Sequence, residues 1–295
     1  MQYVTLSNKV KMPQLGYGVY QVSKDECERC VSDALKVGYR HIDTAQSYFN
    51  EEEVGNAIVK SGIPREEIFI TSKVWVEHYG YEATKASVYE SMRKLKTNYI
   101  DLMLLHQPFS DVYGAWRALE DLYADGKIRA IGISNFYPDR LVDICNFARI
   151  KPMVNQVETH PHNQQVEAQK WMEKYGVQIE AWAPFGEGRG GLFTDETIAK
   201  IAAKYNKSVA QIILRWELQR GIVVIPKSVH IERMEENFNV FDFSLSNEDM
   251  AIMATLDKEQ SSFFSHTDPA MVEWFVQIIE ARKHSNDHRK EKKNW

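Results

Sequence analysis

The sequence predicts an α/β protein, a (β/α)8 or TIM barrel with an N-terminal β-hairpin and extra helices. Strand-like and helix-like segments alternate along the chain, the strand-like segments are short and apolar, and eight such units fit into about 250 residues. A doubly wound open sheet is the alternative, because alternation alone does not show whether the sheet closes.

The strand segments lack the polar alternation of a half-exposed sheet, which is typical of parallel strands covered on both faces. In chain order we expect strands at residues 12–20, 39–43, 68–74, 100–106, 128–134, 152–158, 177–182 and 222–226. A helical segment follows each strand, and the first is amphipathic with Ser23 as its N-cap candidate. We expect these helices at residues 23–36, 50–62, 81–96, 113–124, 138–148, 164–174, 194–204, 230–238 and 246–254. Residues 208–221 are predicted to form an extra helix, and residues 5–13 a hairpin that closes the bottom of the barrel.

The composition indicates one large domain. The chain has 295 residues, of which 44% are apolar and 26% are charged, and no Pro/Gly/Ser-rich linker divides it. We expect a single barrel domain over residues 1–280, followed by a charged, solvated C-terminal tail over residues 281–295.

Charge and cysteine usage favour a cytoplasmic protein without nucleic-acid or membrane partners. The formal net charge of −5 disfavours general nucleic-acid binding, and no run approaches the roughly eighteen apolar residues of a membrane span. The N-terminus alternates polar and apolar residues, unlike a signal peptide. Cys27 and Cys30 form a C-x-x-C, but both lie inside the first predicted helix and no second Cys/His pair accompanies them. We therefore interpret them as reduced helical thiols.

Polar or amphipathic side chains collect where the predicted strands end. In a barrel these ends meet at one face, where the loops build the functional site. So many polar groups at one face need a ligand or a network, because buried unpaired polar groups are costly. The residues are Asp43, Lys73, His106, Ser134, Asn135, Asn155, Gln156, Trp182, Lys227 and Ser228.

Four residues of this face suit proton transfer to a carbonyl group. Neighbouring strands lie about 4.8 Å apart, so Asp43, Lys73 and His106 come within reach of one another, and Tyr48 would fold back over them. An ammonium about 4 Å from a phenol lowers the phenol pKa by roughly three units before burial offsets part of it. Tyr48 would then give a proton near neutral pH, with Asp43 orienting Lys73 and His106 holding the carbonyl oxygen. Reduction of that carbonyl needs hydride from a cofactor.

Several segments resemble the aldo-keto reductase family in order and spacing, across nearly the whole chain. They are GYRHIDTAQSYFNEEEVG, KVW, LMLLHQP, IRAIGISNF, VNQVETHP and IPKSVHIERMEEN. EAWAPFGEG and SSFFSHTDP are most similar to the bacterial branch that contains 2,5-diketo-D-gluconate reductases. The resemblance implies an NADPH-dependent oxidoreductase that acts on CH–OH or carbonyl groups without a metal. It implies a catalytic tetrad, Asp43, Tyr48, Lys73 and His106, in which Tyr48 is the proton donor.

The same resemblance assigns the cofactor site. It places Ser134, Asn135 and Gln156 on the nicotinamide carboxamide, Trp182 against the nicotinamide ring, and Thr44 on the cofactor near the tetrad. For the adenosine half it implies Lys227, Ser228 and Arg233 at the 2′-phosphate, and Glu236 and Asn237 at the adenine. Two cations and a hydroxyl near a helix start suit a phosphate, so we expect NADP rather than NAD.

The substrate pocket is expected to be apolar with a few polar tips, which suits small aldehydes, dicarbonyls or diketo sugar acids. Its candidate lining residues are Tyr20, Trp75, His106, Phe109 and Trp116. The chain departs from the family at Tyr20, Phe49, Gln107 and Ala183. The glycine-rich residues 186–191 are a candidate hinge over the cofactor pyrophosphate.

Two other functions remain open at this point. One is a cofactor-binding redox sensor or regulatory subunit on the same fold, which an intact tetrad disfavours. The other is a metal-dependent barrel hydrolase, for which His160 and His162 beside His41 and Glu158 are candidate ligands without clear ligand spacing. We expect no metal, and we expect a monomer.

Overall fold

The computed structural model describes residues 1–291, with side chains described through residue 282. The chain divides into two compact units, one over Met1–Gln260 and a second that begins at Ser261.

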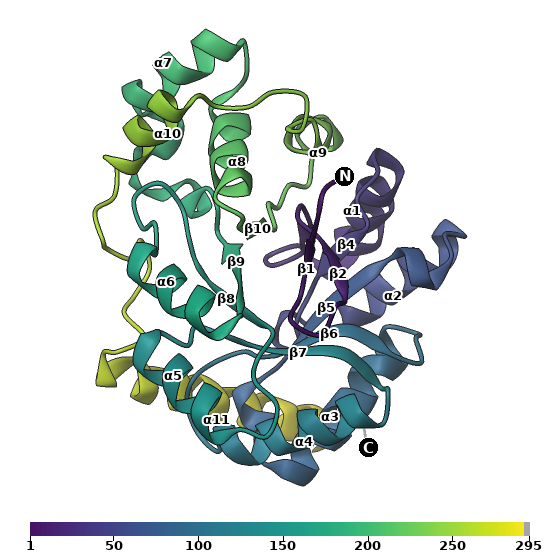
Figure 1. Cartoon of the computed structure of the whole chain (residues 1–295). Coiled ribbons are helices and arrows are strands. Elements are labelled where there is room, and N and C mark those ends of the chain that lie inside the picture. Colours follow the sequence, from purple (N-terminus) through teal and green to yellow (C-terminus); the bar gives the residue numbers. More distant parts are fainter. Residues whose placement is uncertain (292–295) are drawn as a thin grey trace. The chain divides into compact units, whose positions relative to one another are not determined.

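The first unit holds one sheet of eight parallel strands, whose order in the sheet follows the chain (Figure 1). The strands are β3 (Tyr17–Gly18), β4 (His41–Asp43), β5 (Phe69–Val74), β6 (Ile100–Leu105), β7 (Ile128–Ser134), β8 (Val154–Glu158), β9 (Gln178–Trp182) and β10 (Val223–Val224). A parallel bridge between Leu15 and Val224 joins the two ends of the sheet, and the Gly16 amide donates to the Val224 carbonyl at 2.8 Å. The predicted barrel is confirmed, and the doubly wound alternative is wrong.

The first and last strands are shorter than the predicted segments.

Next to β3, the barrel interior is tightly filled: a Cβ added at Gly16 would lie 2.6 Å from Nδ1 of His41. Only glycine lets the backbone pass this close to the imidazole ring.

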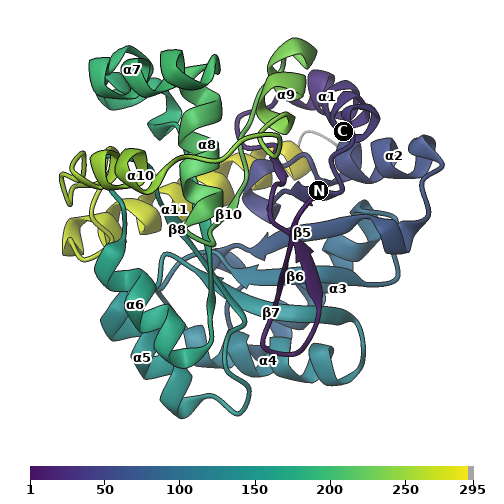
Figure 2. The ribbon, with the colours of Figure 1, turned by 45° about the horizontal axis from the view of Figure 1, so that its top comes forward.

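The helices follow the strands as the sequence predicts, and their ends differ by one or two residues (Figure 2). They are α1 (Lys24–Val37), α2 (Glu51–Ser61), α3 (Tyr81–Lys94), α4 (Val112–Ala124), α5 (Pro138–Phe147), α6 (Val166–Tyr175), α7 (Glu196–Tyr205), α8 (Val209–Gln219), α9 (Ile231–Phe238) and α10 (Asn247–Ala254). Short 3-10 turns lie between them: η1 (Gln46–Tyr48), η2 (Arg65–Glu67), η3 (Val76–His78) and η4 (Gly186–Thr194). Ser23 occupies the N-cap of α1, but its hydroxyl bonds to the Glu26 carboxylate and not to a helix amide.

The predicted hairpin is present at the N-terminus. Strand β1 (Tyr3–Thr5) pairs antiparallel with β2 (Lys11–Pro13). In its turn, Asn8 donates to the carbonyl of Arg129 at 2.9 Å, near the start of β7. The hairpin therefore covers the N-terminal ends of the strands and leaves the opposite face to the loops.

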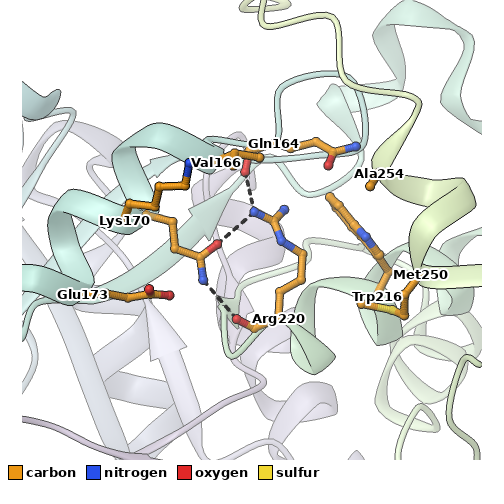
Figure 3. A pocket seen from close by; sticks show the side chains of 9 residues that line it. Gln164, Val166, Lys170, Glu173, Trp216, Arg220, Met250 and Ala254 are labelled. Carbon is orange, nitrogen blue, oxygen red and sulfur yellow. Dashed lines mark hydrogen bonds between the residues drawn. The ribbon is translucent and has the colours of Figure 1, made fainter. Parts of the chain in front are cut away.

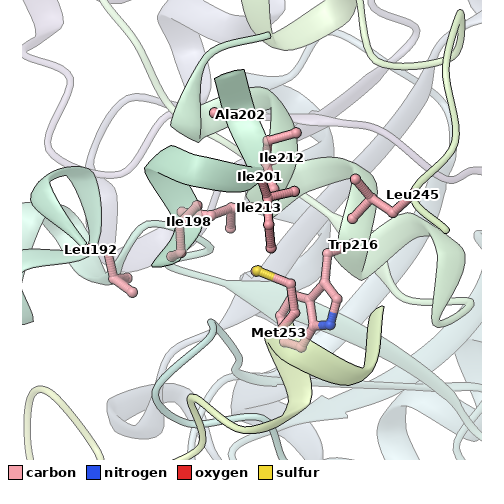
Figure 4. Packing of buried hydrophobic residues seen from close by; sticks show 9 residues of the cluster. All are labelled: Leu192, Ile198, Ile201, Ala202, Ile212, Ile213, Trp216, Leu245 and Met253. Carbon is pink, nitrogen blue, oxygen red and sulfur yellow. The ribbon is translucent and has the colours of Figure 1, made fainter. Parts of the chain in front are cut away.

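The extra helix α8 belongs to a separate apolar cluster beside the sheet (Figure 4). The cluster joins α7, α8 and α10, with Trp216 of α8 only 1% exposed. Leu192 of η4 is part of this cluster and Phe185 packs against it, so the glycine-rich segment is anchored on both sides. Its buried members are Leu192, Ile198, Ile201, Ala202, Ile212, Ile213, Trp216, Leu245 and Met253.

In the second unit, α11 (Pro269–Glu291) is one helix that runs across the boundary predicted between residues 280 and 281. Residues 292–295 of the predicted tail lie outside the described residues, and the boundary stays a prediction. Within residues 1–291, none of the helices combines the length and the apolarity that crossing a membrane requires.

Candidate active site

The four residues of the predicted tetrad come together at the C-terminal ends of β4, β5 and β6. Asp43 ends β4, Lys73 lies in β5, His106 follows β6, and Tyr48 ends the turn η1. The Lys73 ammonium lies 2.5 Å from Oδ1 of Asp43 and donates to the Tyr48 hydroxyl at 3.3 Å. The rings of Tyr48 and His106 meet edge to face with centroids 5.8 Å apart. Tyr48 is thus the only part-buried member of a group otherwise enclosed by the barrel.

The loop from Thr44 to Asn50 returns Tyr48 over Lys73 because it is tied at both ends. The Thr44 hydroxyl donates to the Asn50 side chain at 2.8 Å, and Asn50 donates to the carbonyl of Val19 at 3.0 Å. Lys73 donates to the carbonyl of Thr44 at 3.0 Å. Asn50 is also the N-cap residue of α2.

Burial affects the pKa values of Tyr48 and Lys73 more strongly than the sequence predicted. Burial lowers the pKa of Lys73, but Asp43, Tyr48 and Glu180 together outweigh burial, so the pKa of Lys73 lies above its usual value and the ammonium stays charged. Burial raises the pKa of Tyr48 to about 12, although Lys73 acts to lower it. The expected net fall in the Tyr48 pKa is therefore wrong, because desolvation of the phenolate exceeds the attraction of Lys73. Tyr48 is a neutral phenol at neutral pH and carries the proton that a donor needs.

Aromatic rings pack beside Tyr48 and His106. Tyr20, half exposed, packs on Tyr48 with centroids 4.9 Å apart, and the buried Trp75 meets His106 edge to face at 5.2 Å. Phe109 lies in the loop after His106 and is partly buried. Trp116 does not join them: it is 1% exposed within α4, and its indole N–H donates to the carbonyl of Ile150. The prediction of Trp116 as a lining residue is wrong, because its ring is part of the helix packing.

The residues predicted to hold nicotinamide form a network with one another. The indole N–H of Trp182 donates to Oδ1 of Asn135 at 2.9 Å, and Nδ2 of Asn135 donates to the carbonyl of His106 at 3.1 Å. Ser134 donates to the carbonyl of Gln156 at 2.9 Å. Asn135 adopts a positive φ of 64°, which asparagine tolerates better than most residues. Neighbouring Asn155 instead holds the loop after β7 through the carbonyl of Phe136, at 2.7 Å.

The predicted adenosine cradle lies around the start of α9. Lys227 and Arg233 are exposed, and the Ser228 hydroxyl accepts from the His230 amide at 3.1 Å. Two exposed cations beside a helix N-terminus fit a dianionic phosphate. Glu236 accepts a hydrogen bond from Ser208, and Asn237 is buried at 5% exposure.

Sequence reasoning missed Glu180, a fully buried carboxyl group beside the tetrad. Nε2 of Gln156 donates both to Oδ2 of Asp43 at 2.9 Å and to Oε2 of Glu180 at 3.0 Å. Oε1 of Glu180 lies 3.7 Å from Nε2 of His41. The sequence does contain a sign of it, because Glu180 lies in the middle of the apolar segment VQIEAW. A parallel strand is covered on both faces, so a carboxyl group there is expected to be buried.

The histidines offer no metal centre in the described part of the chain. His160 pairs with Glu158 at 2.9 Å, and no group of three or more His, Cys, Asp or Glu side chains within that part is arranged to hold a metal ion.

A separate pocket lies between α6, α8 and α10 and contains none of the predicted site residues (Figure 3). Arg220 lines this pocket and donates to the carbonyl of Gln164 at 2.7 Å and to Oε1 of Gln169 at 2.8 Å. Its guanidinium also stacks on Trp216, 4.6 Å from the ring centroid. These contacts fasten the helices to one another.

Comparison with known proteins matches nearly the whole barrel. Residues 12–258 match the sequence profile of the Aldo/keto reductase family. The glyoxal reductase of Bacillus subtilis (strain 168) is 51% identical over 259 residues, which cover 87% of this chain and 93% of that protein. The methylglyoxal reductase DkgA of Yersinia pestis is 45% identical over 251 residues, covering 83% of this chain and 89% of that protein. The crystal structure of a Bombyx mori aldo-keto reductase in complex with NADP superposes with a TM-score of 0.85 at 32% identity, covering 89% of this chain and 95% of that one.

Proposed function

The chain belongs to the aldo/keto reductase family, and we propose that it reduces small aldehydes, dicarbonyls or diketo sugar acids to alcohols with NADPH. The observation that carries the proposal is the position of the Tyr48 hydroxyl, 3.3 Å from a buried lysine that is itself paired with Asp43. The names of the glyoxal and methylglyoxal reductases among its relatives support small dicarbonyls as substrates.

Tyr48 is the proton donor in this proposal. Its raised pKa keeps the phenol protonated at neutral pH, and an alkoxide forming on the substrate is a stronger base than a phenolate. The Lys73 ammonium stabilises the phenolate that remains after proton transfer, and Asp43 holds the ammonium in place. His106 orients the substrate oxygen beside the Tyr48 hydroxyl.

The chemistry of the remaining groups fits NADPH, which supplies the hydride when bound. Ser134, Asn135 and Gln156 offer hydrogen-bonding groups to a carboxamide, and Trp182 offers a flat aromatic face. Thr44 is the least direct of the proposed contacts, since its hydroxyl already donates to Asn50.

Lys227, Ser228 and Arg233 would hold the 2′-phosphate beside α9, because two exposed cations gain more from a dianion than from a ribose hydroxyl. Glu236 and Asn237 would contact the adenine. Glu236 is already bonded to Ser208, and its other carboxylate oxygen is the one left for that contact.

The proposed substrate site lies between Tyr20, Trp75, His106 and Phe109. The rings of Tyr20 and Trp75 flank Tyr48 and His106, so a small carbonyl compound would be enclosed by aromatic walls with polar tips. We further propose that the protein acts as a cytoplasmic monomer, with residues 1–280 as its catalytic domain.

The proposal is tested by following NADPH oxidation with methylglyoxal, aromatic aldehydes and diketo sugar acids. Turnover of one class that survives a chelator supports a reductase. Tight NADPH binding without turnover of any of them would instead point to a redox sensor, and loss of activity with the chelator to metal chemistry.

A further inference from the structure

Glu180 lies inside the barrel, directly beside Gln156 in the register of β8 and β9. It is completely buried, and its side chain makes one hydrogen bond among the described residues, in which Oε2 accepts from Nε2 of Gln156 at 3.0 Å. The same nitrogen donates to Oδ2 of Asp43 at 2.9 Å. A primary amide has two N–H groups, so these two carboxyl groups use both of them.

The orientation of the Gln156 amide is therefore fixed by chemistry. The Asp43 carboxylate requires the donor end of the amide, because turning the carbonyl oxygen toward Oδ2 would set two acceptors against each other, and Oε2 of Glu180 accepts from the same end. The carbonyl oxygen Oε1 is then the polar atom of Gln156 left for a ligand, and it accepts hydrogen bonds only.

We propose that Glu180 is a positioning residue, which together with Asp43 turns the acceptor oxygen of Gln156 toward the N–H group of the nicotinamide carboxamide. The inference rests on the proposed NADPH site and assigns to that site a residue that does not itself touch the cofactor.

The charges around Glu180 agree with this role. Asp43, Lys73 and His41 are the titratable groups that face it from β4 and β5, and Gln156 is its polar neighbour on β8. Burial, and then the charge of Asp43, raise the pKa of Glu180 to about 8, while burial lowers the pKa of His41 to about 3. At neutral pH Glu180 is therefore mostly a neutral acid and His41 a neutral imidazole. Glu180 can accept from Gln156 without a second buried negative charge.

The test compares three ligands on the wild type, Glu180→Met and Glu180→Gln. NADP⁺ carries the carboxamide N–H. Its acetylpyridine analogue has a methyl group in place of the amide nitrogen, and adenosine 2′,5′-bisphosphate lacks the nicotinamide altogether. Dissociation constants are measured by quenching of tryptophan fluorescence, and circular dichroism checks that each variant is folded.

Glu180→Met removes one of the two acceptors that hold the Gln156 amide in this orientation, so NADP⁺ should bind about tenfold more weakly, the worth of one oriented hydrogen bond. Binding of the acetylpyridine analogue and of the bisphosphate should stay within about twofold of the wild type. Glu180→Gln keeps an acceptor oxygen at the same place and should restore NADP⁺ binding. An equal loss for all three ligands, or no loss for NADP⁺, would overturn the inference and leave the proposed function standing.

The wild type gives a second test that does not depend on the variants folding. It should prefer NADP⁺ over the acetylpyridine analogue by about tenfold, because only NADP⁺ offers an N–H to Gln156. Equal affinity for the two would overturn the inference. Failure of the wild type to bind NADP⁺ or the bisphosphate at all would refute the proposed function and the inference with it.

Discussion

Replacing Glu180 with glutamine should make the fold more stable at alkaline pH. Burial and Asp43 raise the pKa of Glu180 from the ordinary 4.5 to about 8 in the folded protein. The folded state therefore holds a proton that the unfolded chain has released, and the stability of the wild type falls as the pH rises from 4.5 to about 8. Glutamine has nearly the same size and carries no charge at any pH, so the variant lacks this loss.

The size of the effect follows from the same shift. Between about pH 5 and about pH 9 the wild type should lose about 4 kcal/mol of unfolding free energy that Glu180→Gln keeps, at 1.36 kcal/mol for each unit of pKa. For a chain of this length the difference corresponds to a melting temperature on the order of 8 °C higher for the variant at the alkaline pH.

Urea unfolding of both proteins at the two pH values measures the difference. The two proteins should be similar in stability near pH 5, where Glu180 is neutral, and should separate near pH 9. A difference in unfolding free energy that is the same at both pH values would refute the reasoning, since it would show that Glu180 does not change its charge state on folding in this range. Asp139→Asn is the control variant, because Asp139 lies exposed in α5. Its unfolding free energy should not separate from that of the wild type between the two pH values.

Further predictions concern the tetrad, the cofactor and the glycine-rich segment. Lys73→Met leaves the buried Asp43 carboxylate without its ion-pair partner. The variant should lose about 3 to 5 kcal/mol of unfolding free energy, and its kcat should fall by at least about a hundredfold. A variant as stable and as active as the wild type would contradict the ion pair. Lys227→Met should raise the KM for NADPH about tenfold and leave the KM for NADH within about twofold, and equal changes for both would exclude a phosphate contact. Trypsin should cut after Arg189 more slowly once NADPH is added, because Glu187, Gly188, Gly190 and Gly191 around it have positive φ, as in a hinge. Cutting at an unchanged rate would count against closure over the cofactor.

The sequence was sufficient to place the tetrad because strand ends alone determine where Asp43, Lys73 and His106 meet. Each ends or follows a short apolar segment, and the ends of parallel strands share one face of a barrel. The return of Tyr48 was predictable from loop length, and the extra helix α8 from its own apolar periodicity.

What depends on contacts across the barrel was not predictable. The pKa of Tyr48 reflects the burial of its hydroxyl in the folded barrel and not the spacing to Lys73 alone. Glu180 was missed because its role depends on the register of β8 and β9, which places it beside Gln156. Trp116 was misplaced because an aromatic residue one turn into a helix can face the pocket or the helix packing, and its bond to Ile150 decides between them.

Tyr48→Phe tests the central claim most directly, because it removes one hydroxyl and keeps the ring that packs on Tyr20 and His106. Single-turnover oxidation of bound NADPH by methylglyoxal should slow by about a hundredfold to ten-thousandfold, the usual contribution of a general acid, while the dissociation constant for NADPH stays within about twofold. Oxidation of bound NADPH at the wild-type rate in this variant would contradict the assignment of Tyr48 as the proton donor.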